Sequence, residues 1–523
     1  VTVLLGIVAL AGIVVVVLTS TEWGHERVRR IALSQLQSHI HGKASIGKLS
    51  GNLLTGLTVH DLSISDSTGE PFIAAQEVSA RYALGALIGK KIWLEDVRLV
   101  RPLIVLDRPP GGKWNYQRIF QSDTTSQPST GPGFGSWIRL ENVTLVDGDL
   151  LVKTPWAPSA GLSPVARDSA VRAALSGQGR AMVVPATRSY GGAPPYQKQV
   201  ELRSLNASLP MLRLADPNEK NRYAEVASLQ MTALPFRPPA AVVTDMRGNF
   251  NFNNDSLWWR GIRAAMPNSR VSGDGSYALS SGDMVLTLRG APAALPDLRW
   301  LYPRLPSEGG GSVDFAMRWK GTVQDYVAKN ADLAIGKTTV KGDFGITMSD
   351  TFALHDTNLR FANFDTRLAE QLIAGFKSPR RGSLSGRAAL SGGKNALRVD
   401  GDVAFADAAT GTSQVAAVGE VGFGAGTVRA NNLRLRLHPV QVELAKALAS
   451  GLQIPVSGVV TGTATVTGDT RTRLAGNLDI AHDDRGNHSQ LTGTAAVRLP
   501  RGGAAPWMDV NVVARPISLA EVG

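Results

Sequence analysis

Histidine and acidic side chains are the first residues to consider for catalysis or metal binding in this chain of 523 residues. Among its 8 histidines, His482 and His488 have the spacing closest to that of a metal site, with Asp483 and Asp484 between them. These residues lie in a polar segment rich in Gly and Asn. That composition favours a solvated hairpin turn over a metal site, so we predict no metal here.

Other candidate motifs are equally weak. Asp147-Gly148-Asp149 and Asp274-Gly275 have acidic spacing reminiscent of calcium loops, but Asp-Gly is most typical of turns, and we predict turns at both places. The sequence contains no P-loop, G-x-S-x-G or H-E-x-x-H pattern. It has no cysteine, which excludes disulfides, thiolate metal sites and cysteine nucleophiles. We therefore predict no catalytic residue, no metal and no cofactor, and hence no enzyme.

The amino-terminal segment is apolar from Val1 to Leu18 apart from Thr2, with no charge inside it. A stretch of this length just spans a bilayer. A signal peptide is the alternative, but the residues around Ser20 offer no small-residue cleavage site. We therefore predict a retained transmembrane anchor over residues 1–20, followed by Trp23 at the membrane interface. The anchor residues are Val3, Leu4, Leu5, Ile7, Val8, Leu10, Ile13, Val14, Val15, Val16, Val17, Leu18 and Trp23.

The segment after the anchor is predicted to be an amphipathic helix over residues 21–42. Val28, Ile31, Leu36 and Ile40 fall near helical spacing, with polar residues between them. Such a helix either lies on the membrane surface or caps the first layer of a folded domain. The sequence leaves both alternatives open.

Beyond residue 42 the apolar period changes to two, and one pattern recurs: apolar, any, apolar, two polar, apolar, any, apolar. The alternation predicts half-buried strands. The central polar pair adds one residue, which would reverse the apolar face unless a bulge absorbs it. We therefore predict bent strands that keep one apolar face. The copies are residues 57–64, 92–99 and 138–145, with weaker ones at 200–207, 224–231, 257–264 and 428–435.

A longer repeat of about 76 residues occupies the second half of the chain. Each copy is predicted to be a short helix ended by proline, followed by strands punctuated by glycine. Such units stack on one another to build a core along the stacking axis. The matching residues are Leu368, Leu372, Phe376, Pro379, Gly382, Gly386 and Gly392, with Leu444, Leu448, Leu452, Pro455, Gly458, Gly462 and Gly468.

Together these patterns predict a mainly β protein. Its single N-terminal transmembrane helix would be followed by an elongated, curved, repetitive and mostly antiparallel β-sheet groove with short helices. Few amphipathic helices are available to cover the apolar face, so curling, a second sheet or acyl chains must bury it. The expected organisation is an anchor at 1–20, a juxtamembrane helix at 21–42, a β region at 43–120, a flexible linker at 121–136, a β region at 137–285 with an insertion at 154–198, and tandem repeats at 286–523, the last truncated.

The apolar positions of these strands are the candidate lining of the groove. They come from five of the predicted strands in the first half and the second half of the chain. They are Leu57, Val59, Leu62, Ile64, Ile92, Leu94, Val97, Leu99, Ile138, Leu140, Val143, Leu145, Val313, Phe315, Met317, Leu433 and Leu435.

A family resemblance covers about the first 110 residues of the chain. The segment from Ile46 to Val59, followed by Ala80-Arg81-Tyr82, Leu87-Ile88-Gly89-Lys90, Arg101-Pro102 and Asp107-Arg108, resembles the AsmA-like superfamily, most closely the amino-terminal part of TamB-type translocation and assembly module subunits. The resemblance implies an anchor in the inner membrane of a diderm bacterium with the bulk of the chain in the periplasm. It also implies a curled sheet with an apolar interior that carries phospholipid toward the outer membrane or assists outer-membrane protein assembly.

The excess of basic over acidic residues indicates which classes of partner the protein could bind. The chain has 55 Lys and Arg against 43 Asp and Glu, a net charge of +12. Both signs are dispersed without the aromatic interleaving of a nucleic-acid surface, so we predict no nucleic acid. Anionic lipid headgroups or plain solvation account for the excess. Two functions remain: phospholipid transfer or outer-membrane biogenesis, and an accessory subunit docked by its transmembrane helix onto a large respiratory, photosynthetic or secretory inner-membrane complex.

Overall fold

The computed structural model describes residues 21–52, 55–83, 85–86, 89, 91–120, 136–253, 255–424, 427–448, 456–498 and 507–516. The chain is mainly β, with 63% strand and 12% helix, which confirms the predicted class. It divides into two compact units. Unit 1 comprises Val1–Ser276 and Asp297–Pro303, and unit 2 comprises Tyr277–Pro296 and Arg304–Gly523.

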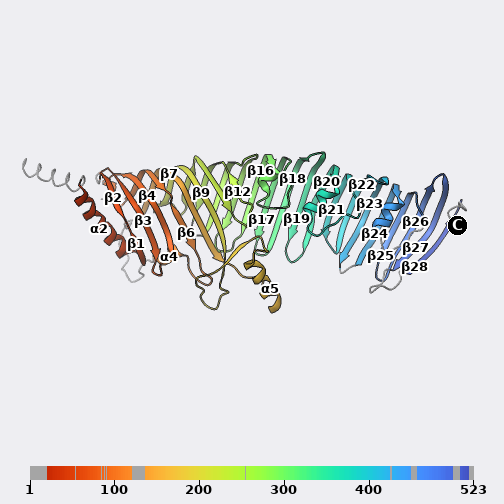
Figure 1. The fold of residues 1–523 in the computed structure, drawn as a ribbon, viewed down its shortest axis with the longest axis horizontal. Coiled ribbons are helices and arrows are strands. Elements are labelled where there is room, and N and C mark those ends of the chain that lie inside the picture. Colours follow the sequence, from red (N-terminus) through yellow and green to blue (C-terminus); the bar gives the residue numbers. More distant parts are fainter. Residues whose placement is uncertain are drawn as a thin grey trace, which may run out of the picture. The chain divides into compact units, whose positions relative to one another are not determined.

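Unit 1 is a sheet with three described α-helices (Figure 1). The helices are α2 (Glu22–His39), α4 (Asn115–Ile119) and α5 (Pro164–Leu175). The strands are β1 (Gly42–Ser45), β2 (Lys48–Asn52), β3 (Gly56–Asp66), β4 (Pro71–Tyr82), β5 (Lys91–Val100), β6 (Leu103–Asp107), β7 (Trp137–Pro155), β8 (Met182–Pro185), β9 (Tyr196–Ala215), β10 (Arg222–Val226), β11 (Ser228–Leu234), β12 (Ala241–Val243), β13 (Asp245–Phe252), β14 (Ser256–Ala265) and most of β15 (Arg270–Ala278).

Two predicted segments fall largely outside the described residues. The anchor predicted at residues 1–20 lies there, and Trp23 follows it as an exposed residue of α2. No helix in the described part of the chain is long and apolar enough to cross a membrane. The flexible linker predicted at residues 121–136 also lies outside, except for Ser136.

Helix α2 confirms the helix predicted after the anchor. It begins where the Thr21 hydroxyl accepts a hydrogen bond from the backbone N–H of Gly24 at 3.2 Å. Arg29 donates to the carbonyl of Ile46 at 2.9 Å, and Figure 1 shows the helix beside β1 and β2. The helix thus caps the first strands of the sheet, which is one of the two positions that the sequence left open. Ile31 departs from the expected apolar stripe because its side chain is 57% exposed.

Several strands of unit 1 are built from two pieces that pair with one longer neighbour. β5 and β6 are separate because Pro102 has no N–H for the ladder, and the preceding Arg101 has a φ of 46°. Both pieces run parallel to β7, whereas the other strand pairs described are antiparallel. A parallel pair requires a crossover, and the chain passes through α4 between β6 and β7.

Unit 2 is an antiparallel meander in which each strand pairs with the next in sequence. Its described helices are short. The elements are β16 (Met284–Ala294), η1 (Leu295–Leu298), β17 (Gly310–Lys320), β18 (Val323–Ile335), β19 (Thr338–Met348), β20 (Phe352–Asp365), α6 (Thr366–Leu372), β21 (Gly382–Gly393), β22 (Ala396–Asp407), β23 (Gly411–Gly424), β24 (Thr427–Gln441), α7 (Val442–Leu448), β25 (Val459–Asp469), β26 (Arg473–Asp484), β27 (Asn487–Arg498) and β28 (Trp507–Ala514).

The predicted repeat corresponds to four strands and one helix. Helices α6 and α7 begin 76 residues apart, at Thr366 and Val442, and four strands lie between them. The repeat glycines Gly386 and Gly462 have φ values of 147° and 124°. A Cβ at either position would lie 2.1 or 2.2 Å from a carbonyl oxygen of the next strand. Glycine is needed there because the neighbouring strands approach so closely.

The predicted bulges are present in six of the seven copies of the eight-residue pattern, all of which lie in described segments. In each, the second residue of the polar pair adopts positive φ, which absorbs the extra residue. The exception is residues 224–231, where the polar pair falls at the break between β10 and β11. The residues with positive φ are Asp61, Asp96, Asn142, Ser204, Gly261 and Asn432.

Candidate functional site

The residues predicted to line a groove all lie on covered parts of the sheet. Every one of the seventeen is buried or half-buried, and none is exposed. Val97, Val143 and Met317 are the most covered, with 6% exposure or less. Residues next to them along the strand, such as Arg98 and Thr144, are exposed. The bulges therefore preserve one apolar face, as the sequence pattern predicted.

In unit 1 these residues form rows that run across the strands. Directly opposed residues in a ladder have neighbouring side chains on the same face. One row crosses seven strands without a charged residue: Leu49, Val59, Val78, Leu99, Leu145, Ala207 and Leu229. A second row crosses six strands: Ile64, Ile73, Ile104, Leu150, Leu202 and Ala233.

In unit 2 a corresponding row crosses all thirteen strands of the meander. Most of its members are large apolar residues, three are glycine or alanine, and only Tyr326 carries a polar side-chain atom. Its members are half-buried or buried up to Val497, and Met508 on the last strand is exposed. The row is Leu286, Met317, Tyr326, Ile346, Leu354, Gly392, Leu397, Val421, Ala430, Gly468, Leu474, Val497 and Met508.

The opposite face of the same strands is charged. The row that alternates with the apolar one across β19 to β27 contains basic and acidic residues at most positions. Its members are Lys341, Arg360, Arg387, Asp402, Ala416, Arg436, Thr463, Asp479 and Thr492. The sheet of unit 2 is thus apolar on one side and hydrophilic on the other.

No second layer of described residues closes over the apolar face of unit 2. Among its described buried apolar side chains, only Leu295, Met317, Leu368 and Val442 are larger than alanine. Its described α-helices, α6 and α7, have 7 residues each, too few to cover thirteen strands. A soluble sheet normally buries its apolar face against another layer. Here the apolar side chains stay half-buried.

The sequence pattern missed further bulges, two of which lie in β18 and β20. Asn330 in β18 and Asp356 in β20 have φ values of 51° and 47°, with the same ladder shift as the recognised copies. The apolar position that follows holds Ala331 in one and Thr357 in the other, which weakened the pattern. The available signal was Asn or Asp as the second polar residue, because these types tolerate positive φ best.

Side chains from the next strand stabilise several of these bulges. The backbone N–H of Asn330 donates to Asp343 at 2.9 Å, and that of Asn432 donates to the Thr467 hydroxyl at 3.3 Å. In unit 1, the N–H of Ser204 donates to Asp149 at 3.2 Å. These acceptors satisfy N–H groups that the bulge removes from the ladder.

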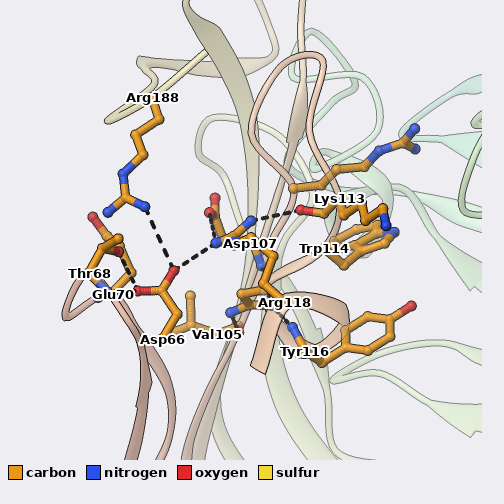
Figure 2. Close-up of polar contacts among 12 residues, drawn as sticks. Asp66, Thr68, Glu70, Val105, Asp107, Lys113, Trp114, Tyr116, Arg118 and Arg188 are labelled. Atoms are coloured by element: carbon orange, nitrogen blue, oxygen red, sulfur yellow. Dashed lines mark hydrogen bonds and ion pairs between the residues drawn. The ribbon is translucent and has the colours of Figure 1, made fainter. Parts of the chain in front are cut away.

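A buried ionic cluster at one strand edge of unit 1 was not foreseen (Figure 2). Arg118, on α4, donates to the Asp66 carboxylate at the end of β3 at 2.9 Å and lies 3.6 Å from Asp107 at the end of β6. The Asp66 side chain is 2% exposed. Arg188 of the insertion lies 4.0 Å away, and Gln197 of β9 donates to Asp107 at 2.7 Å. The cluster therefore joins β3, β6, β9, α4 and the insertion.

The electrostatics of this cluster keep Asp66 charged. Burial by itself would raise the pKa of Asp66, but hydrogen bonds from the Thr68 hydroxyl and Arg118, with those from two backbone N–H groups, outweigh it. The pKa of Asp66 is lowered to about 2. Asn115, fully buried, accepts from the Asp107 N–H at 3.1 Å and donates to the Val105 carbonyl at 2.6 Å. These bonds make the cluster a structural junction.

The histidine segment forms the predicted hairpin. Its turn lies between β26 and β27 at Arg485 and Gly486, both with positive φ. His482 pairs with Ser489 across the ladder, while Asp483 pairs with His488, so the two histidines occupy opposite faces. Within the described part of the chain no group of three or more His, Asp or Glu could hold a metal ion.

The two Asp-Gly turns predicted from the sequence are wrong. Asp147 lies inside the 19-residue strand β7 and forms a bulge with φ of 50°. Asp274 lies inside β15 and accepts a hydrogen bond from the Gly261 N–H at 2.6 Å. Asp-Gly adopts positive φ easily, and a bulge uses that property within a strand just as a turn does between strands.

Comparisons with protein-family models, with curated proteins and with solved structures found no match. The site is therefore defined by its geometry alone: an apolar sheet face in each unit, backed in unit 2 by a charged face.

Proposed function

We propose that the protein transfers phospholipid along the apolar face of its sheet, as an AsmA-like, TamB-like component of outer-membrane biogenesis. Val1–Leu18 would anchor it in the inner membrane of a diderm bacterium, with the bulk of the chain in the periplasm. The observation that carries the proposal is the uninterrupted apolar row across the thirteen strands of unit 2. Neighbouring strands are about 4.8 Å apart, so such a row offers acyl chains a continuous apolar surface.

Energetics support an apolar ligand on this face. Half-buried apolar side chains leave area in contact with water, at a cost of about 25 cal/mol for each Å². An exposed apolar patch much larger than a few hundred Å² marks a binding surface. Acyl chains would cover it without requiring a polar group on that face. The charged opposite face, with Arg360, Arg387 and Arg436, keeps the outside hydrated.

Photo-crosslinking tests the proposal in the full chain. A benzophenone amino acid at Phe315 or Leu435 faces the apolar side, whereas the same probe at Arg436 faces the charged side and serves as the matched control. We expect phospholipid adducts by mass spectrometry at the first two positions and none at the third. Lipid-free protein without adducts would contradict lipid transfer. If that protein also stayed bound to a large membrane complex, the accessory-subunit function would be favoured.

A further inference from the structure

A charged residue interrupts the apolar face of unit 1 near one end of β9. Lys198 lies directly opposite Thr154 of β7 and Val183 of β8, two positions from Val200 and four from Leu202. Since side chains alternate along a strand, Lys198 shares the face of Val200 and Leu202, which belong to the apolar surface. Its side chain is half-buried. An amine at this place is costly unless an anion accompanies it.

A second cation, Arg180, lies over the same aromatic ring as this amine, and Arg237 follows that ring in the chain. The Lys198 ammonium is 5.8 Å from the centre of the Phe236 ring, and the Arg180 guanidinium is 5.3 Å from the same centre. Arg180 donates to backbone carbonyls of Arg237, at 3.1 Å, and of Trp300. Arg237 donates to the Ala174 carbonyl at 2.9 Å, near the end of α5. No carboxylate is paired with Lys198, Arg180 or Arg237 among the residues that the structure describes.

Unsatisfied donors occur in the same cluster. The indole N–H of Trp300 and the Nε of Arg237 are buried without a hydrogen-bond partner in the described part of the chain. The Trp300 ring stacks on Phe236 with centroids 6.4 Å apart. A buried donor without an acceptor is unfavourable, so this cluster favours a ligand that supplies acceptor oxygens. Burial alone lowers the pKa of Lys198 and of Arg180, consistent with cations that lack a counter-ion.

We propose that Lys198, Arg180 and Trp300 form a binding site for a phosphate group, and that the ligand is the phosphate of a phospholipid whose acyl chains lie toward Val200 and Leu202. Phosphate offers both the negative charge and the acceptor oxygens that the cluster lacks. The assignment to a lipid rests on the proposed function, because the apolar face next to Lys198 would hold the chains. The phosphate site itself rests on the cations and unsatisfied donors.

Equilibrium binding to the full-length protein tests the site. The probes are fluorescent phosphatidylglycerol, the diacylglycerol with the same acyl chains and no phosphate, and inorganic phosphate. We expect Lys198→Met to weaken phosphatidylglycerol binding about tenfold, the loss of one charge-assisted contact, and to leave diacylglycerol unchanged. Lys198→Arg should restore most of the affinity. Trp300→Phe should weaken phosphatidylglycerol binding less than Lys198→Met, because it removes one neutral donor.

The matched control is Lys153→Met. Lys153 lies on β7 opposite Gln199, one residue from the Thr154–Lys198 pair and therefore on the other face. Its loss should leave phosphatidylglycerol binding unchanged. Thermal stability gives a second readout: Lys198→Met removes a desolvated charge and should unfold no earlier than the wild type, whereas a purely structural lysine would destabilise the fold when lost.

Failure of the site and failure of lipid transfer give different results. Equal phosphatidylglycerol binding by wild type and Lys198→Met would overturn the phosphate site and leave lipid transfer standing. If the wild type bound neither lipid, lipid transfer would fail, and inorganic phosphate would decide the site. Phosphate binding abolished by Lys198→Met would support a site for a free phosphate compound. Absence of phosphate binding would overturn it.

Discussion

Unit 1 and unit 2 stabilise their sheets by different means. Unit 1 has broken strands, parallel pairs and a long insertion, and the buried cluster around Asp66 and Arg118 joins five of its elements. Unit 2 repeats a pattern of four strands and a helix. In unit 2 the buried Asp407 pairs with Arg380 at 2.6 Å and accepts a hydrogen bond from the Ala409 N–H at 2.9 Å. The irregular unit depends on specific polar contacts, whereas the regular one depends on backbone pairing and glycine.

The largest expected effect is the loss of the Asp66 carboxylate. Asp66→Asn would leave Arg118 buried with no full counter-charge from that position and should lower the free energy of unfolding of unit 1 by about 4 kcal/mol. The matched change in unit 2 is Asp400→Asn, because Asp400 pairs with Arg387 at 3.1 Å with both side chains more than half exposed. That change should cost less than about 0.5 kcal/mol. Hydrogen exchange of peptides from each unit, followed against denaturant, measures both, and equal losses would contradict the comparison.

Acid should remove the advantage that Asp66 gives to unit 1. Its folded pKa of about 2 lies below the ordinary value of 3.8, so its contribution is complete above about pH 4 and is lost as pH falls toward 2. The shift corresponds to about 2 kcal/mol. We therefore expect the stability difference between wild type and Asp66→Asn to shrink by that amount between pH 4 and pH 2. A difference that stayed constant would show that charge is not its origin.

Glycine should matter most in the repeats of unit 2. Gly462→Ala places a Cβ 2.2 Å from the Asp479 carbonyl at a φ of 124° and should cost about 2 kcal/mol. Gly476→Ala is the matched control on the neighbouring strand, because its Cβ would come no closer than 3.2 Å to the Thr465 carbonyl. The control should change stability by less than about 0.5 kcal/mol. Hydrogen exchange in β25 and β26 distinguishes them, and a similar effect of both would reject the role given to close strand approach.

The smallest expected effect is the loss of His355 in unit 2, whose contribution to stability depends on pH in the opposite direction to that of Asp66. Burial would lower the pKa of His355 in unit 2, but hydrogen bonds to Asp356 and Asp325 outweigh it and raise the pKa. Its contribution is therefore complete below the ordinary value of 6.5 and is lost as pH rises through the raised pKa. At this partly exposed pair, His355→Asn should cost a few tenths of a kcal/mol at pH 5.5 and nothing at pH 9. Asp325→Asn should reduce that pH dependence, as measured by exchange in β18 to β20. An equal cost of His355→Asn at both pH values would contradict a role for the charge of His355.

The strand and repeat patterns could be predicted because they depend on local order. The polar pair in residues 428–435 implied a bulge, and the structure places it at Asn432. The 76-residue offset placed α6 and α7 correctly, since equal spacing of Leu, Pro and Gly reflects equal structure. The Asp147 turn was wrong because a local Asp-Gly signal does not distinguish a bulge from a turn, and the Asp274 turn was wrong because Asp274 instead accepts the N–H of the bulge at Gly261.

The sequence by itself determined the alternation that gives an apolar and a charged face, the bulges that preserve it and the length of the repeat, because each follows from the order of residues along a strand. Only the tertiary structure decided which strands are neighbours, and therefore that Val59, Leu99 and Leu145 lie in one row. It also brought Asp66 to Arg118, and Lys198 to Arg180 and Phe236. These residues are far apart in the chain, and backbone pairing between distant segments sets their distances, which no local pattern encodes.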